Sequence, residues 1–161
     1  MEGIGTKAFS AETINSQKQQ GITEIVITFD GSFNKNLFTG FGTATYENGS
    51  TYTGNWQYGD RNGFGQLILS QNYYYRGHFS GGSYHGRGTL RNVIEENDDV
   101  IFNENFIKVT SIVQNYGGEY IGEFKSGKAN GFGILTLGSG SRSQIFKGYY
   151  SNDRLDRPFR E

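Results

Sequence analysis

The sequence predicts an all-β protein made of many short strands joined by tight turns, and three observations predict it. The 161 residues include 25 glycines, 13 phenylalanines and 11 tyrosines but a single proline. Strands favour aromatic residues and tight turns favour glycine. A short pattern recurs along the chain. Within each copy, the aromatic and glycine positions alternate with the period of two that is typical of a strand.

Composition excludes several classes of protein. Hydrophobic residues make up only 34% of the chain, but disordered segments are poor in aromatic residues, so a folded protein is expected. The net charge of −1 lacks the positive field of a nucleic-acid binder, so no nucleic-acid partner is predicted. The absence of cysteine excludes a disulfide framework and fits a reducing compartment. No apolar run reaches the roughly 18 residues of a membrane span, and the N-terminus lacks a signal-peptide pattern.

The recurring pattern has four clear copies, at residues 29–42, 52–65, 75–88 and 120–133. The second copy reads YTGNWQYGDRNGFG, and the first copy has Asn36 where the others have glycine. Agreement at so many fixed offsets indicates a repeat protein. The structural signature of the three best copies comprises Tyr52, Gly54, Trp56, Gly63, Gly65, Tyr75, Gly77, Phe79, Gly86, Gly88, Tyr120, Gly122, Phe124, Gly131 and Gly133.

Weaker copies are predicted around the clear ones. The long step from Tyr75 to Tyr120 predicts a degenerate hairpin over 97–115, with Ile101 at the Trp/Phe position and Thr110 and Ile112 on its second strand. A truncated copy is predicted at 146–157. Residues 1–21 are predicted to hold a partial repeat, with Gly3 and Gly5 as its paired glycines, and a Gln-rich loop at about 10–20. The array is then predicted to start with a strand at 22–29, to end at 157 and to be followed by a tail at 158–161.

The shared positions resemble those of the MORN repeat, over about residues 22–157. This resemblance implies that each unit is a β-hairpin. It also implies that successive hairpins stack into an elongated, twisted antiparallel sheet, with about six to seven units including the degenerate ones. Proteins of the resembled family occur in cytoskeletal, ciliary and organelle-linked assemblies, and their repeats also occur as accessory modules of larger enzymes.

Alternation along the strands predicts which side chains share a face. Tyr52, Gly54 and Trp56 fall on one face of the first strand of their unit, and Gly63 and Gly65 fall on one face of the returning strand. Glycine leaves an open slot, and aromatic side chains that cover glycines set the register of a sheet. We therefore expect the two rings to lie over glycines of the same or the neighbouring hairpin.

The residue between the paired glycines faces away from that aromatic side. It is phenylalanine in three clear units and arginine in the other. Aligned in a row, these residues predict an apolar stripe, which either packs within the protein or forms a groove for a partner's helix or extended segment. The candidate protein-binding residues are Phe41, Phe64, Ile68, Arg87, Phe132 and Ile134.

Catalysis is not predicted. His78 and His85 lie in one unit without a third ligand at metal-binding spacing. The G-x-G pairs lie between strands and precede no helix, so they do not form a phosphate-binding loop. We therefore expect no catalytic residues, no cofactor and no metal ion.

Two further segments are candidates for contacts. The tail carries Arg154, Arg157 and Arg160 around Phe159, and either caps the last hairpin or docks into a neighbouring subunit. The acidic run at 95–99 is either a solvated turn or a site read by a basic partner.

The predicted function is that of a non-catalytic scaffold or adaptor for protein partners, as a structural subunit of a cytoskeletal, ciliary or other large assembly in the cytoplasm. One alternative is a peripheral module that binds phospholipid, an activity attributed to the resembled family. Because the chain has no basic cluster, we expect weak or no membrane binding. The other alternative is an accessory repeat module of a larger enzyme.

Overall fold

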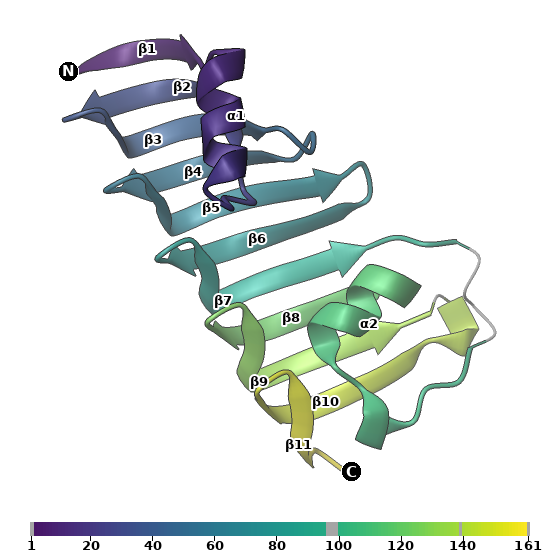
Figure 1. Ribbon diagram of the computed structural model, residues 1–161. Coiled ribbons are helices and arrows are strands. Elements are labelled where there is room, and N and C mark those ends of the chain that lie inside the picture. The colour runs from purple at the N-terminus through teal and green to yellow at the C-terminus, as the bar shows by residue number, and fades with distance from the viewer. Residues whose placement is uncertain (1, 96–99, 139, 161) are drawn as a thin grey trace.

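The computed structural model describes residues 2–95, 100–138 and 140–160, and its strands form one open antiparallel sheet in sequence order. The 11 strands follow one another down the sheet from the N-terminus to the C-terminus (Figure 1), so the predicted fold class is confirmed. The strands are β1 (Gly3–Ala8), β2 (Val26–Asn34), β3 (Leu37–Tyr46), β4 (Thr51–Gln57), β5 (Asp60–Ser70), β6 (Tyr73–Ser80), β7 (Ser83–Asn92), β8 (Gly118–Lys125), β9 (Lys128–Leu137), β10 (Gln144–Ser151) and β11 (Arg154–Pro158).

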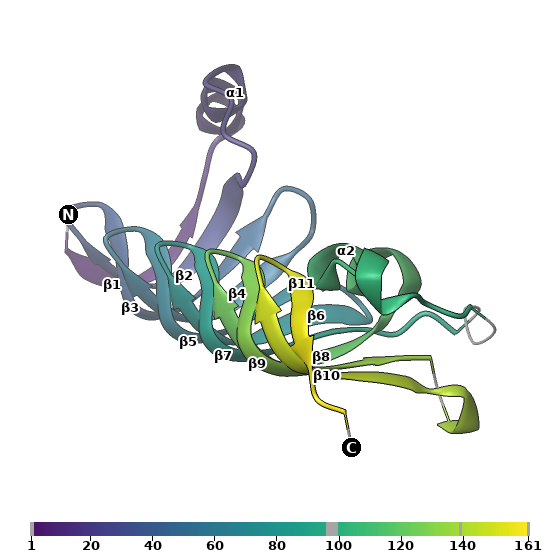
Figure 2. The ribbon, with the colours of Figure 1, turned by 90° about the horizontal axis from the view of Figure 1, so that it is seen from below.

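Two α-helices, α1 (Ala11–Gln19) and α2 (Val109–Tyr116), accompany the sheet, together with the short 3₁₀ turns η1 (Glu104–Phe106) and η2 (Gly140–Arg142). Seen along the stack, the hairpin tips curve toward one side, and both helices lie on that side (Figure 2). We call this side the inner face and the opposite side the outer face. The outer face is therefore covered by neither helix.

Consecutive strands form five hairpins, from β2–β3 to β10–β11, and β1 pairs with β2. Both residues at each hairpin tip have positive φ, as in Lys35 and Asn36 (50° and 64°) or Tyr58 and Gly59 (51° and 83°). This is the geometry of a type I′ turn, which matches the twist of the strands and accepts asparagine in place of glycine. The first unit therefore keeps its turn although it carries Asn36.

The predicted degenerate hairpin at 97–115 is wrong, and the number of units is lower than the predicted six to seven. Strand β7 pairs directly with β8, with Leu90 opposite Tyr120, so no hairpin lies between them. Part of the segment forms α2 instead. Its apolar residues Val109, Ile112, Val113 and Tyr116 recur at helical spacing, which places them on one side of a helix. The strand spacing predicted for Thr110 and Ile112 therefore does not apply to this segment.

Helix α2 is attached to the sheet at both of its ends. At its N-terminus, the carboxylate of Asp153, in the turn between β10 and β11, accepts a hydrogen bond from the backbone N–H of Thr110 at 3.1 Å. At its C-terminus, Asn92 Nδ2 donates to the carbonyls of Val113 (3.1 Å) and Gln114 (3.0 Å). A negative charge beside a helix N-terminus is stabilising. Helix α2 thus lies over the sheet (Figure 1) without interrupting the strand order.

The Gln-rich segment predicted as a loop is also helical, which corrects that prediction. Ser10 caps α1 by accepting a hydrogen bond from the N–H of Thr13 at 3.2 Å, and α1 has no buried residue. An ion pair between Lys18 and Glu47 connects α1 to the turn after β3. The strand predicted at 22–29 begins later, at Val26.

A ladder of glycines crosses the sheet from β1 to β10. Each ladder glycine pairs with the one on the next strand, in the order Gly5, Gly31, Gly42, Gly54, Gly65, Gly77, Gly88, Gly122, Gly133 and Gly148. The phenol of Tyr52 lies over two of them. A Cβ on Gly54 would come within 2.7 Å of its hydroxyl, and one on Gly65 would come closer still. The predicted placement of rings over glycines is confirmed for Tyr52.

The row beside the ladder alternates aromatic and aliphatic side chains and forms the core. Tyr52, Tyr75 and Tyr120 are fully buried, yet each hydroxyl has a partner. That of Tyr52 donates to the carbonyl of Asn55 at 2.8 Å, that of Tyr75 to the carbonyl of His78 at 2.8 Å and that of Tyr120 to the carbonyl of Glu123 at 3.1 Å. Buried tyrosine hydroxyls need such partners. The row comprises Phe29, Ala44, Tyr52, Leu67, Tyr75, Leu90, Tyr120 and Leu135, all at most 4% exposed.

The two glycines of each G-x-G do not share a face, contrary to prediction. Gly63 has φ of 82° and lies at a β-bulge, where the register shifts between Gly54 and Trp56. A Cβ on Gly63 would point at the outer-face side chain of Asn55, at 3.5 Å, whereas Gly65 lies beneath Tyr52. A bulge adds a residue and breaks the alternation of side chains. The first glycine therefore permits the backbone turn, and the second leaves room for the ring.

Burial of the tyrosines predicts that the protein loses stability in alkali. Burial raises the pKa of Tyr52 from the usual 10.0 to about 12, and burial also raises the pKa of Tyr75, Tyr120 and Tyr150. The unfolded chain releases these protons first, so the tyrosines' contribution is complete below pH 10 and falls as the pH rises to 12 and beyond. Circular dichroism and tyrosinate absorbance, recorded through an alkaline titration, should change together. Ionisation of every tyrosine before any loss of structure would contradict this.

Candidate functional site

The candidate residues between the paired glycines lie on the outer face as predicted by alternation. Phe41 is 66% exposed and Phe64 is 53% exposed. They do not form a continuous stripe, because the strand between them places Asn55 in the same row: Phe41 pairs with Asn55, whose amide donates to the carbonyl of Phe64 at 3.2 Å. Phe64 in turn pairs with His78, with the two rings edge to face at 5.8 Å.

Four of the six candidates come together around an open groove of about 620 Å³ in the middle of the outer face. They are Phe64 from β5, Arg87 from β7, and Phe132 and Ile134 from β9. Phe41 and Ile68 lie outside the lining, although Ile68 is 40% exposed on the same face. The groove spans strands β5 to β9, so its two apolar ends come from units on either side of the inserted segment.

Ile121 is an additional lining residue that the sequence reasoning missed. It is 52% exposed and lies in a row between Thr89 of β7 and Ile134 of β9. The signal was available in the sequence. Ile121 stands between Tyr120 and Gly122, where two other units carry Thr53 and Arg76, and alternation places that position on the outer face.

Charges of both signs lie among these apolar side chains. Arg76 and Arg87 line the groove, and Glu123 pairs with Arg87 across the strands. The Glu123 carboxylate also accepts a hydrogen bond from the N–H of Phe132 at 2.6 Å, which holds it at the groove. An apolar surface with interspersed charges of both signs suits a peptide segment, because interface centres are apolar and charges set the register.

The C-terminal tail packs on the outer face beside this groove. The ring of Phe159 lies 5.4 Å from that of Phe132 and 5.5 Å from that of Tyr149, and the N–H of Phe159 donates to the carbonyl of Lys147 at 2.7 Å. Arg160 pairs with Glu104 at 2.7 Å. Of the two alternatives for the tail, the structure shows the cap on its own sheet, and this cap covers part of Phe132.

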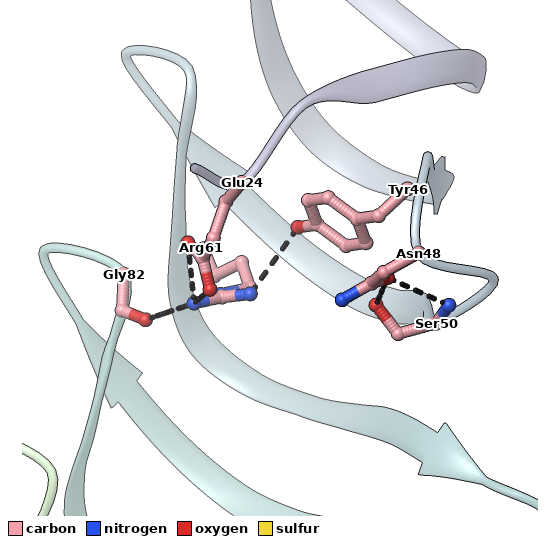
Figure 3. Close-up of polar contacts among 6 residues, drawn as sticks. All are labelled: Glu24, Tyr46, Asn48, Ser50, Arg61 and Gly82. Carbon is pink, nitrogen blue, oxygen red and sulfur yellow. Dashed lines mark hydrogen bonds and ion pairs between the residues drawn. The ribbon is translucent and has the colours of Figure 1, made fainter. Parts of the chain in front are cut away.

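A buried arginine organises the inner face near the N-terminal end. Arg61 is 7% exposed, and its guanidinium donates to Glu24, to the hydroxyl of Tyr46 at 3.3 Å and to the carbonyl of Gly82 at 2.6 Å (Figure 3). It lies over the ring of Tyr52, at 6.0 Å from the ring centre. All three guanidinium nitrogens have partners within the protein, so this cluster joins the segment before β2 to three hairpins and does not present a free charge.

Arg61 stands where two other units carry a stacked ring, Phe38 and Tyr84. Tyr84 lies at the equivalent position and stacks on Tyr75 at 3.9 Å, with the two planes 9° apart. The backbone N–H of Gly82, at the tip of the next hairpin, donates to the carbonyl of Arg61 at 3.0 Å. In the same way, the N–H of Gly127 donates to the carbonyl of Tyr84 at 2.9 Å. These bonds stack the hairpin tips on one another. No local feature of the sequence marks Arg61 as buried.

The remaining candidate features of the sequence are metal ligands, membrane-spanning segments and the acidic run at 95–99. Within the described residues, no group of three or more histidine, cysteine, aspartate or glutamate side chains is arranged to hold a metal ion. A search of the same residues finds no helix long and apolar enough to cross a membrane. The acidic run at 95–99 lies outside the described residues except for Glu95.

The fold and the outer face define a class: an open, single-sheet protein of stacked β-hairpin repeats with an uncovered face. Comparison with protein families places the chain within it. The MORN repeat model matches residues 29–51, 52–71, 75–92 and 120–142, more than half of the chain, so the chain belongs to the MORN-repeat family. Such repeats are typical of modules for interaction or membrane binding and are generally non-catalytic. Comparison with curated proteins finds no significant match.

Proposed function

We propose that this protein is a non-catalytic scaffold that binds a partner protein in the outer-face groove, as a structural subunit of a cytoskeletal, ciliary or other large cytoplasmic assembly. The observation that carries the proposal is the groove lined by Phe64, Ile121, Phe132 and Ile134. The aromatic residues of the inner face are buried by the fold itself, whereas Phe64 and Ile121 remain more than half exposed. Exposed apolar residues gathered around a groove mark an interaction site.

The arrangement of charges supports a protein segment over a lipid surface as the ligand. Binding to anionic lipid needs a cluster of basic residues on the membrane-facing side. On the outer face, acidic residues stand opposite the basic ones: Arg87 is paired with Glu123 across the strands, and Arg91 lies 3.7 Å from Glu119. The β7–β8 strand pair therefore offers both signs, which suits a helix or extended segment with its own mixed charges.

The test is chemical cross-linking of the protein in native extract, followed by mass spectrometry, with Phe64→Glu as the disrupting variant. Phe64→Glu places a charge in the groove, where it must be desolvated when a partner covers it, so specific cross-linked partners should be lost by about tenfold or more. Ile101→Glu is the matched control, because Ile101 is 90% exposed and lies outside the groove.

Thermal melts of both variants within about 0.5 kcal/mol of the wild type would show that folding is intact. Retention of the same partners by Phe64→Glu, or equal loss with Ile101→Glu, would overturn the groove proposal. Sedimentation with anionic liposomes provides the competing outcome: binding that weakens as salt rises, and that needs Arg76 and Arg87, would assign the face to a membrane instead.

A further inference from the structure

The edge of the sheet formed by β1 has no strand beside it among the residues that the structure describes. Strand β1 is the first in the order of the sheet and is paired only with β2 (Figure 1). An open edge carries a row of unpaired backbone N–H and C=O groups and is a template for another strand.

The register identifies β1 as the second strand of a repeat unit. Gly5 pairs with Gly31 of the following unit, in the same way that Gly65 pairs with Gly77. In each complete unit, that second-strand glycine also pairs with the glycine of its own first strand, as Gly65 does with Gly54. The open edge of β1 therefore corresponds to the place of a first strand, which carries the sequence aromatic-x-Gly.

The slot above Gly5 is empty. In the units of Tyr52, Tyr75 and Tyr120, the tyrosine of the first strand covers the ladder glycine of the second, so that a Cβ there would collide with the phenol. A Cβ on Gly5 would meet no atom within 4 Å. The ring that would cover Gly5 belongs to the first strand of its own unit, because Phe29 on β2 covers Gly31 and Gly42 instead.

The backbone of β1 presents its free groups at alternate residues. The N–H of Phe9 donates to the carbonyl of Ile27 at 2.9 Å, so the backbone hydrogen-bonding groups of Phe9 face β2. Because an antiparallel strand alternates the direction of its hydrogen-bonding groups, Lys7, Gly5 and Gly3 also face β2. The N–H and C=O groups of Ile4, Thr6 and Ala8 then face the open edge.

An apolar hollow of about 360 Å³ runs along this edge. It is lined by β1 from Gly3 to Lys7 together with Phe33 and Asn36 from the next hairpin. Ile4 is 87% exposed on the outer face. An added strand would therefore gain main-chain hydrogen bonds along the edge and apolar contact on both faces, which is the energetic basis of β-strand addition.

We propose that the β1 edge binds an extended segment of a partner chain with the sequence aromatic-x-Gly, which adds as an antiparallel strand. Its glycine lies opposite Gly5, and its aromatic ring covers the empty slot above Gly5. A second copy of this chain is not the donor through its own aromatic-x-Gly strands, because β2, β4, β6, β8 and β10 are each paired on both sides. This site is separate from the outer-face groove.

The probe is a fluorescein-labelled peptide with the sequence of residues 50–58, STYTGNWQY, which contains the first strand of the Tyr52 unit. Fluorescence anisotropy with the full chain should show saturable binding. A peptide with Tyr52→Ala lacks the ring for the slot, and one with Gly54→Val cannot approach Gly5 closely. Both should bind at least about tenfold more weakly.

On the protein, Thr6→Pro removes one N–H at the open edge without removing a hydrogen bond to β2, and proline is tolerated at such edge positions. Thr6→Val keeps the N–H and is the matched control. Peptide binding should fall at least about tenfold in Thr6→Pro and remain in Thr6→Val and in Phe64→Glu.

Hydrogen exchange supplies a second measurement that does not depend on the variants. The amides of Ile4, Thr6 and Ala8 should gain protection when the peptide is bound, because they donate to it. Absence of saturable binding, equal binding of the Tyr52→Ala peptide, or protection confined to other strands would each overturn the proposal. Since Phe64→Glu leaves this site unchanged, failure here is distinguishable from failure of the groove proposal.

Discussion

Trp56→Ala is expected to lower the free energy of unfolding by about 3–5 kcal/mol. The indole is 5% exposed and touches rings of two hairpins, with Phe29 at 5.3 Å, Phe38 at 5.2 Å and Tyr52 at 5.0 Å between ring centres. Its Nε1 donates to the carbonyl of Gly42 at 3.1 Å. Truncation leaves a cavity between hairpins and removes the partner of that buried carbonyl.

The measurement is chemical denaturation followed by circular dichroism. Stability in a stacked repeat depends on the contacts between neighbours, so the loss of Trp56 should uncouple the β2–β3 hairpin and broaden the transition. Phe41→Ala is the control, because Phe41 is an aromatic residue of the same region but is 66% exposed. Its effect should remain within about 0.5 kcal/mol. An unfolding curve of Trp56→Ala that coincides with the wild type would refute the stacking account of stability.

Asp153→Ala is expected to cost about 2–4 kcal/mol, because it leaves buried donors without partners. Asp153 is buried, at 5% exposed. Its carboxylate accepts from the N–H of Ala129 at 3.1 Å and, as the cap of α2, from the N–H of Thr110 at 3.1 Å. The Thr110 hydroxyl donates to the same carboxylate at 2.5 Å. Loss of these three bonds should release α2 from the sheet and expose the core residues beneath it.

Backbone strain must be separated from the loss of these bonds, because Asp153 has φ of 74°. Asp153→Gly removes the carboxylate but relieves that strain, and Asp153→Asn keeps one acceptor oxygen and tolerates positive φ. Stability should rank wild type, then Asn, then Gly, then Ala. Hydrogen exchange of α2 amides reports undocking directly. Unchanged protection of α2 in Asp153→Gly would show that the cap does not hold the helix.

Part of the candidate site was predictable, and the reason is the alternation of side chains along a strand. Alternation placed Phe64, Phe132 and Ile134 on the same face, and the same rule applied to Ile121 would have added it. It did not predict which of these residues share a groove. That depends on β7 lying directly beside β8 and on the tail covering part of Phe132, and both are contacts between residues distant in the chain.

The sequence by itself determined the repeating unit. Each residue of the pattern has a local structural role. Gly63 adopts a positive φ, Gly65 leaves room for the ring above it, and the hydroxyl of Tyr52 donates to the carbonyl of Asn55, three residues along the same strand. Such roles recur at fixed spacing, so they are visible in one sequence, and the start of each matched repeat coincides with an aromatic residue of the pattern.

Only the tertiary structure decided the conformation of the segment inserted between two repeats and the burial of Arg61. The segment containing Ile112 is short enough to suit a strand or a helix, and the sheet favours the helix by supplying Asp153 and Asn92 as caps for its two ends. Arg61 is buried because Glu24 and Gly82, from distant segments, complete its hydrogen bonds. These partners come together only when the hairpins stack, so no local pattern records them.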